Sequence, residues 1–158
     1  MSGLPSIYQI AFSSLKGISI ETANEILSDV GTEENFFRMS DIDLQKLSGT
    51  NNRIFDDTYR SGLLENARKE QEFITNKNIG TYYFRDENFP VRLQNAPDAP
   101  LLIYSAGRCD LNAKKMVSIV GTRHATIYGA NLCRDLVSSL KDKIGSDIII
   151  VSGLAYGI

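Results

Sequence analysis

The residues of this sequence best suited to chemistry lie in one short loop that begins at Gly121. A glycine lets the backbone approach a ligand closely, and Arg123 carries a planar, permanently charged fork suited to phosphate oxygens. Thr122 and Thr126 add hydroxyl groups to the same loop. These residue types at this spacing predict a cleft that binds a phosphate or another anion.

The elements on either side of the loop favour the same chemistry. Residues 116–120 predict a buried strand, residues 126–143 an amphipathic helix with Thr126 as its N-cap, and residues 147–151 a second buried strand. This order is typical of a βαβ crossover between parallel strands. In such sheets ligands bind at the carboxyl ends of the strands, where the N–H groups of a helix N-terminus also attract anions.

Further residues are expected at this edge of the sheet. Ser152 and Gly153 follow the second strand and would form the other wall of the cleft. Tyr128 and Gly129 lie in the first turn of the helix, where Tyr128 either stacks on a base or packs against the sheet edge. An alternative interpretation is also open: the glycines make only a tight turn, and Arg123 pairs with a surface carboxylate.

Several kinds of site are not expected. The Gly-x-Gly-x-x-Gly fingerprint is absent and no acidic residue ends the second strand, which argues against a dinucleotide cofactor. No Walker A loop occurs. Cys109 and Cys133 lack metal-ligand spacing, and His124 is the one histidine, so we expect no metal site. We expect no cofactor.

Composition and charge narrow the function classes. The chain has 158 residues, of which 42% are hydrophobic and 23% charged, as in globular proteins. No apolar stretch is long enough to span a membrane and no signal peptide is recognisable, so we expect a cytoplasmic protein with free thiols and no membrane partner. Residues 1–107 hold 10 Lys/Arg and 15 Asp/Glu, whereas residues 108–158 hold 7 and 4. An anionic partner should therefore prefer the second part.

The periodicity of the chain predicts an α/β fold in two domains. Residues 1–77 read as short helices, ending in a longer one from about 60 to 77 with Leu63, Leu64, Ala67, Phe73 and Ile74 facing inward. Residues 78–158 begin with two short strands separated by a proline-containing connection. They continue into the βαβ unit, which we expect to be the first part of a Rossmann-like sheet.

Several spaced motifs occur in order in the second part of the chain. They are Phe89-Pro90-x-x-Leu93, Ala99-Pro100-Leu101-Leu102-x-Tyr104-x-x-Gly107, Val117–Arg123, Thr126-x-Tyr128-Gly129 and Val151-Ser152-Gly153-Leu154-Ala155-x-Gly157-Ile158. Over residues 80–158 the sequence resembles the DNA-processing protein A (DprA/Smf) family. It departs from the family at Phe89, where Tyr is usual, and at Tyr156, where Arg is frequent.

The resemblance implies a function that the spacing alone does not. Family members are non-catalytic proteins that bind and protect single-stranded DNA and help to load the RecA recombinase during natural transformation. Their Gly-Ser/Thr-Arg loop lies in the DNA-binding pocket, which corresponds here to Gly121, Thr122 and Arg123. They form homodimers through a later part of the Rossmann-like domain. We expect this chain to be an N-terminal part of such a protein, ending within that domain.

The first part of the chain resembles the family less closely. Residues 15–27 resemble a helix-hairpin-helix element of a SAM-like domain, with Ser19 in place of the usual second glycine. The element either contacts DNA through its turn or is a structural or partner-docking module. For the whole chain two other classes of function stay open: a nucleotide-phosphate-binding enzyme resembling phosphoribohydrolases, and a domain used mainly for protein interaction.

Overall fold

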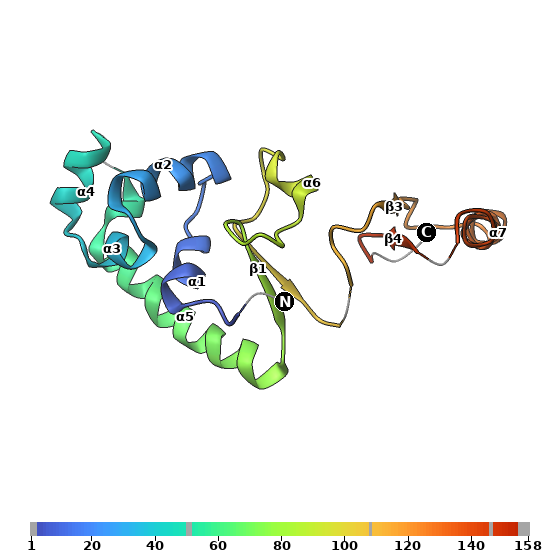
Figure 1. Ribbon diagram of the computed structural model, residues 1–158, viewed down its shortest axis with the longest axis horizontal. Helices are drawn as coiled ribbons and strands as arrows, with labels where there is room; N and C mark the ends of the chain where they lie inside the picture. The colour runs from blue at the N-terminus through green and yellow to red at the C-terminus, as the bar shows by residue number, and fades with distance from the viewer. Residues whose placement is uncertain (1–2, 50–51, 108, 146, 155–158) are drawn as a thin grey trace. The chain divides into compact units, whose positions relative to one another are not determined.

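The computed structural model describes residues 3–49, 52–107, 109–145 and 147–154, which fall into two compact units that divide between Cys109 and Asp110. The first unit is built from helices followed by a small sheet (Figure 1). Its helices are α1 (Ile7–Ser13), α2 (Ile20–Val30), α3 (Glu33–Arg38), α4 (Asp41–Ser48), the 3-10 turn η1 (Arg53–Phe55), α5 (Asp57–Lys77) and α6 (Val91–Gln94). Its strands are β1 (Gly80–Tyr83) and β2 (Leu102–Ser105).

Side-chain caps explain where the helices begin. Thr32 and Ser40 cap α3 and α4 by accepting backbone N–H groups, as their sequence context predicts. Ser19 caps α2 in the same way, which accounts for a serine where the hairpin resemblance leads one to expect glycine. Asp56 caps α5, so this helix begins three residues before the predicted start. Asn78 ends it in the left-handed conformation.

The core of the first unit is aromatic. Phe12 and Phe36 are fully buried and meet edge to face, with ring centroids 5.3 Å apart. Phe37 continues the cluster with a second edge-to-face contact on Phe36. These rings join α1 to α3, and α1 also packs against α5. Ala67 and Ile74 of α5 are buried as predicted, but Phe73 is 55% exposed, so the inward stripe of this helix is narrower than predicted.

Arg60 is a charged residue in this core and is only 1% exposed. Its guanidinium donates to the carbonyl oxygens of Phe36 and Met39 at the end of α3, and it lies 3.6 Å from Asp57. Burial lowers the pKa of Arg60, while the surrounding carboxylates oppose that shift. The side chain therefore satisfies carbonyls that α3 leaves without intrahelical partners.

The sheet of the first unit is an antiparallel hairpin in which Gly80 pairs with Ser105 and Tyr83 with Leu102. The Tyr83 hydroxyl donates to a Glu33 carboxylate oxygen of α3 at 2.8 Å. Burial, and then the negative charge of Glu33, raise the pKa of Tyr83. This contact joins residues fifty positions apart and groups the hairpin with the helices in one unit.

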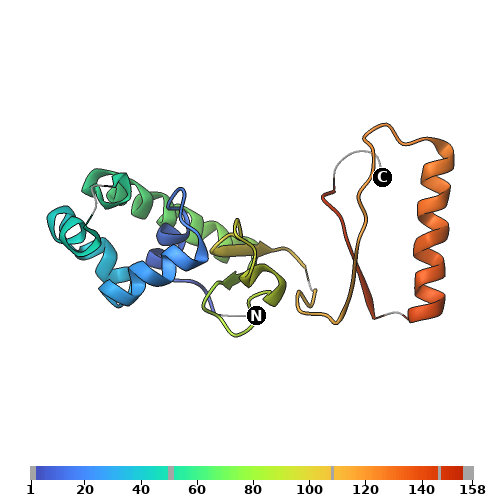
Figure 2. The same ribbon diagram turned by 90° about the horizontal axis from the view of Figure 1, so that it is seen from above.

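The second unit contains β3 (Lys115–Ser118), α7 (Ile127–Ile144) and β4 (Ile148–Val151). Strands β3 and β4 pair in parallel, and α7 runs alongside them (Figure 2). The predicted βαβ order is thus observed, and the mixed α/β class is confirmed. The Rossmann-like sheet, the SAM-like character of residues 1–77 and the boundary at residue 77 stay predictions, although packing places residues 78–109 with the helices.

The sequence of the helix over 126–143 predicts an inward face made of Ala130, Leu132, Cys133, Leu136, Val137 and Leu140. This prediction is only partly correct. Ala130, Cys133, Val137 and Leu140 are half-buried, but Leu132 and Leu136 are 55% and 48% exposed. A two-stranded sheet covers one narrow stripe of a helix, so apolar residues beyond that stripe remain in solvent. Cys109 and Cys133 are free thiols.

The Arg60 contacts generate a stability prediction. Arg60→Met keeps most of the apolar volume but leaves the carbonyls of Phe36 and Met39 without donors, and should lower the unfolding free energy of the helical unit by about 2–3 kcal/mol. Urea denaturation followed by far-ultraviolet circular dichroism measures this change. Arg68→Met, on the exposed side of α5, is the matched control, and equal stability of the two variants would contradict the role of Arg60.

The Tyr83 contact generates a pH prediction. A folded-state pKa above the unfolded value, about 10 for tyrosine, means that the protonated phenol stabilises the fold below that pH and that this stability is lost as the pH rises further. Tyr83→Phe should therefore flatten the alkaline decline of stability, measured as melting temperature against pH. Tyr128→Phe removes a phenol from an exposed site as the control. An alkaline decline as steep in Tyr83→Phe as in the unmodified protein would count against the contact.

Candidate nucleic-acid interface

The parallel pairing of β3 and β4 brings two loops to the same edge of the sheet. Lys115 pairs with Ile148 and Ser118 with Val151, and the pairing continues one step further because the Ile119 N–H donates to the Val151 carbonyl at 2.9 Å. Since the strands run in the same direction, the segments that follow them both leave from the carboxyl edge. The predicted site residues on the two loops therefore share an edge within one unit.

The N-terminus of α7 lies at the end of the first loop. Thr126 is in an extended conformation, and its hydroxyl oxygen accepts the Gly129 N–H at 3.1 Å, which confirms the predicted N-cap. The Thr126 carbonyl accepts the first intrahelical bond, from Ala130, at 3.0 Å. The N–H groups of Ile127 and Tyr128 precede that bond and have no carbonyl partner within the helix. They and the helix dipole produce a positive potential at this end of α7.

Arg123 is exposed in the middle of the loop. The hydroxyl oxygen of Thr122 accepts the His124 N–H at 3.3 Å and so holds the turn on which Arg123 sits. Within the part of the chain that the structure describes, Arg123 lies in no ion pair with a carboxylate. The surface pairing considered as an alternative is therefore not seen there, and the guanidinium faces solvent.

Gly121 does not have the positive φ angle that favours glycine. Among the described residues, the glycines with positive φ are Gly17, Gly31, Gly49, Gly107 and Gly145. The φ angle therefore does not account for the glycine at position 121.

The loop that follows β4 also has free space around its glycine. A Cβ added at Gly153 would meet no heavy atom within 4 Å. Ser152 accepts the Leu154 N–H on its hydroxyl oxygen at 3.3 Å, and Leu154 has a φ of 52°, a conformation that costs a non-glycine residue energy. Ser152 and Gly153 are exposed in this turn.

Tyr128, in the first turn of α7, is 75% exposed. It does not pack against the sheet edge in the described part of the chain, so its ring is accessible for stacking. Its neighbour Ile127 is 84% exposed. The cluster formed by Gly121, Thr122, Arg123, Thr126, Tyr128, Gly129, Ser152 and Gly153 is called the carboxyl-edge cluster below.

Lys114 precedes β3 and Lys115 is its first residue, so both lie at the opposite, amino edge of the sheet. Lys115 donates to the Ile144 carbonyl at the end of α7 at 2.9 Å, a capping role that sequence reasoning missed. Both lysines line a cavity of about 430 Å³ together with Asp110 and Asp147. Because both lysines lie at the amino edge, they are not part of the carboxyl-edge cluster.

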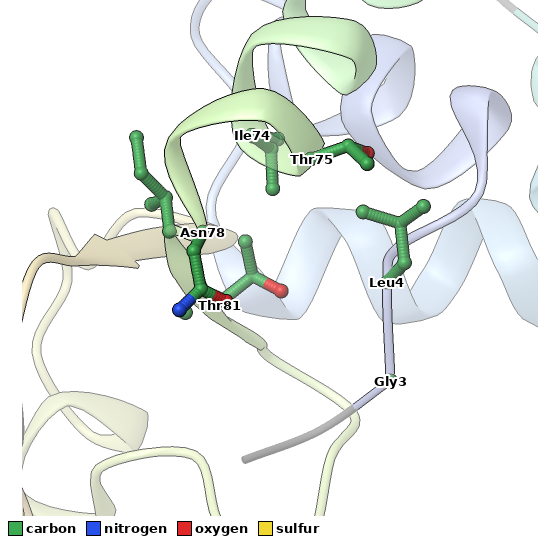
Figure 3. A pocket seen from close by; sticks show the side chains of 8 residues that line it. Gly3, Leu4, Ile74, Thr75, Asn78 and Thr81 are labelled. Atoms are coloured by element: carbon green, nitrogen blue, oxygen red, sulfur yellow. The ribbon is translucent and has the colours of Figure 1, made fainter.

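Other features of the described residues carry less chemistry. A pocket of about 270 Å³ lies between Leu4 of the N-terminal segment, the end of α5 at Ile74, Thr75 and Asn78, and Thr81 of β1 (Figure 3). No charged side chain lines it. Within the described ranges no three His, Cys, Asp or Glu side chains gather as a metal site would require. None of the helices described is long and apolar enough to cross a membrane.

The cap of α7 yields a prediction. Thr126→Ala removes the acceptor for the Gly129 N–H and should destabilise the helix by about 1 kcal/mol. Faster hydrogen exchange at Gly129 and in the first turn of α7 is the expected result, while Thr126→Ser, which keeps the hydroxyl, should exchange like the unmodified protein. Unchanged exchange in the alanine variant would mean that the cap does not hold this end of the helix.

Comparison with known proteins gives a family match over the second half of the chain. The model of the family described as DNA recombination-mediator protein A matches residues 80–158. This range is half of the chain and contains the whole carboxyl-edge cluster.

Individual relatives agree with the family match. The DNA processing protein DprA of Streptococcus pneumoniae is 29% identical over 117 residues, which is 73% of this chain and 38% of that protein. The DNA processing protein DprA of Bacillus subtilis is 33% identical over 81 residues, or 51% of this chain and 26% of that protein. The chain thus spans less than two fifths of the length of these relatives.

Proposed function

We propose that this chain, which belongs to the DNA recombination-mediator protein A family, binds single-stranded DNA at its carboxyl-edge cluster and acts as a non-catalytic accessory protein in recombination. The observation that carries the proposal is the position of Arg123. An exposed arginine without a carboxylate partner in the described chain stands beside a capped helix N-terminus and open strand ends. Fixed donors and a free cation of this kind suit a phosphodiester backbone.

The other cluster residues support a strand of nucleic acid rather than a small anion. Thr122 and Ser152 offer hydroxyl groups on the two loops, and Gly121 and Gly153 leave the backbone accessible. The exposed ring of Tyr128 suits stacking on an unpaired base, which single-stranded nucleic acid presents and a duplex does not. Residues 108–158 also carry a net positive charge, whereas the chain as a whole is net negative.

The wider role is proposed from the family alone. We include in it the protection of incoming DNA, the loading of a RecA-type recombinase during natural transformation in the cytoplasm, and a homodimer of the whole protein. Leu132 and Leu136 of α7 are exposed apolar residues. Such residues are expected on a surface that contacts further protein. No recombinase-contacting residue is assigned.

The central prediction concerns Arg123. Arg123→Ala should weaken the binding of a labelled single-stranded oligonucleotide by about 1–3 kcal/mol, because a charge-assisted contact is lost, and should leave the melting temperature nearly unchanged. Fluorescence anisotropy at moderate salt measures the affinity. Arg134→Ala is the matched control, since Arg134 lies on α7 in the same unit and donates to Asn131.

Two outcomes would oppose the proposal. Equal affinity of the Arg123 and Arg134 variants would remove the carboxyl-edge cluster from the binding site. Displacement of the oligonucleotide by an equimolar mononucleotide would instead point to a nucleotide-binding enzyme. An affinity for DNA that falls as salt rises is expected of phosphate contacts.

A further inference from the structure

A second positively charged hollow lies in the helical unit, away from the sequence motifs of the family match. It is a pocket of about 150 Å³ between the turn that joins α1 to α2 and the η1 turn. Lys16 contributes from the first turn, Asn52, Arg53 and Ile54 from the second, and Tyr59 from the start of α5. Residues that are distant in sequence thus place two cations around one small space.

The two cations are not neutralised by neighbours. Lys16 and Arg53 are exposed, and neither forms an ion pair with any carboxylate that the structure describes. The carboxylates nearest to Arg53 in sequence have other partners. Asp56 accepts the backbone N–H three residues later at 2.8 Å, and Asp57 lies 3.6 Å from Arg60. The pocket therefore keeps its positive charge within an acidic unit.

The position of Arg53 prepares it to bind an anion. Its guanidinium carbon lies 5.4 Å from the centroid of the Tyr59 ring, so the ring supports the side chain. A guanidinium stacked on a ring keeps its N–H donors, which point outward in its plane, available for oxygen acceptors. Asn52 accepts the Ile54 N–H at 3.1 Å, which fixes the turn that carries Arg53.

The size of the pocket selects the ligand. Sites for whole small molecules measure about 300–1,000 Å³, so a space of about 150 Å³ admits one phosphate group rather than a nucleotide. A single phosphate with two cations binds weakly by itself. It binds usefully when it belongs to a polymer that is already held elsewhere, because the second contact is then intramolecular.

We propose that the Lys16–Arg53 pocket binds one phosphate of a single-stranded DNA backbone. The inference rests on the proposed function and adds to it a contact in the helical unit. The net charge of residues 1–107 is unfavourable for DNA, but charges are screened over about 8 Å at physiological salt. Beyond that distance the acidic residues of the unit contribute little to the potential at the pocket.

The test measures how affinity for a long oligothymidylate depends on salt, using the full chain. Each phosphate contact on a single strand contributes about 0.7 to the slope of log K against log salt. The double variant K16Q/R53Q should lose about that amount and bind several-fold more weakly. The control K46Q/K69Q removes two cations from the same unit that pair instead with Asp43 and Glu65, and should keep the slope.

The outcomes separate this inference from the proposed function. In one outcome, the unmodified chain binds DNA, Arg123→Ala weakens this binding, and K16Q/R53Q and K46Q/K69Q show the same slope of log K against log salt. That outcome excludes the pocket as a phosphate site and leaves the carboxyl-edge cluster as the proposed interface. If the unmodified chain does not bind single-stranded DNA, the inference and the proposed function are both wrong.

Amide chemical shifts of the unmodified chain give a readout without substitutions. Gly17 and Arg53 should shift on titration with oligothymidylate, and unshifted signals under saturation would overturn the proposal.

Discussion

The parallel pairing of β3 with β4 is the constraint on which the candidate interface depends. Two strands that run the same way must be joined by a crossover, here the helix α7, and the pairing brings the segments after Ser118 and Val151 to one edge. The helix must then begin at that edge, with its unpartnered N–H groups beside the strand ends. An antiparallel pairing would place these segments at opposite edges, and Arg123 and Ser152 would have no common ligand.

Local compensation of charge, rather than net charge, distinguishes the residues proposed to bind DNA. The chain carries a net charge of −2, yet Arg123, Lys16 and Arg53 have no carboxylate partner among the described residues. Arg60 shows the opposite case, since its charge is buried and satisfied by two carbonyl oxygens of the core. Cations of the same type therefore have structural or binding roles according to what already surrounds them.

Features set by neighbouring residues could be predicted from the sequence. The Thr126 cap and the βαβ order depend on local patterns, and both are observed. Features set by packing between distant segments could not be predicted: the burial of Arg60 depends on carbonyls of α3, and the hairpin joins the helices through Tyr83 and Glu33. The exposure of Phe73 and Leu132 was missed because an apolar stripe shows that a face can be buried, not whether enough protein covers it.

The most direct test of the account is photo-crosslinking of the chain to an oligothymidylate that carries bromodeoxyuridine, followed by mass spectrometry of the peptides. The exposed Tyr128 ring at the carboxyl edge should make residues 121–129 a principal site of crosslinking, and excess unlabelled oligothymidylate should suppress it. Bound DNA whose crosslinks all lie outside residues 121–129 and 152–154 would contradict the claim that the carboxyl edge of the parallel pair is the interface.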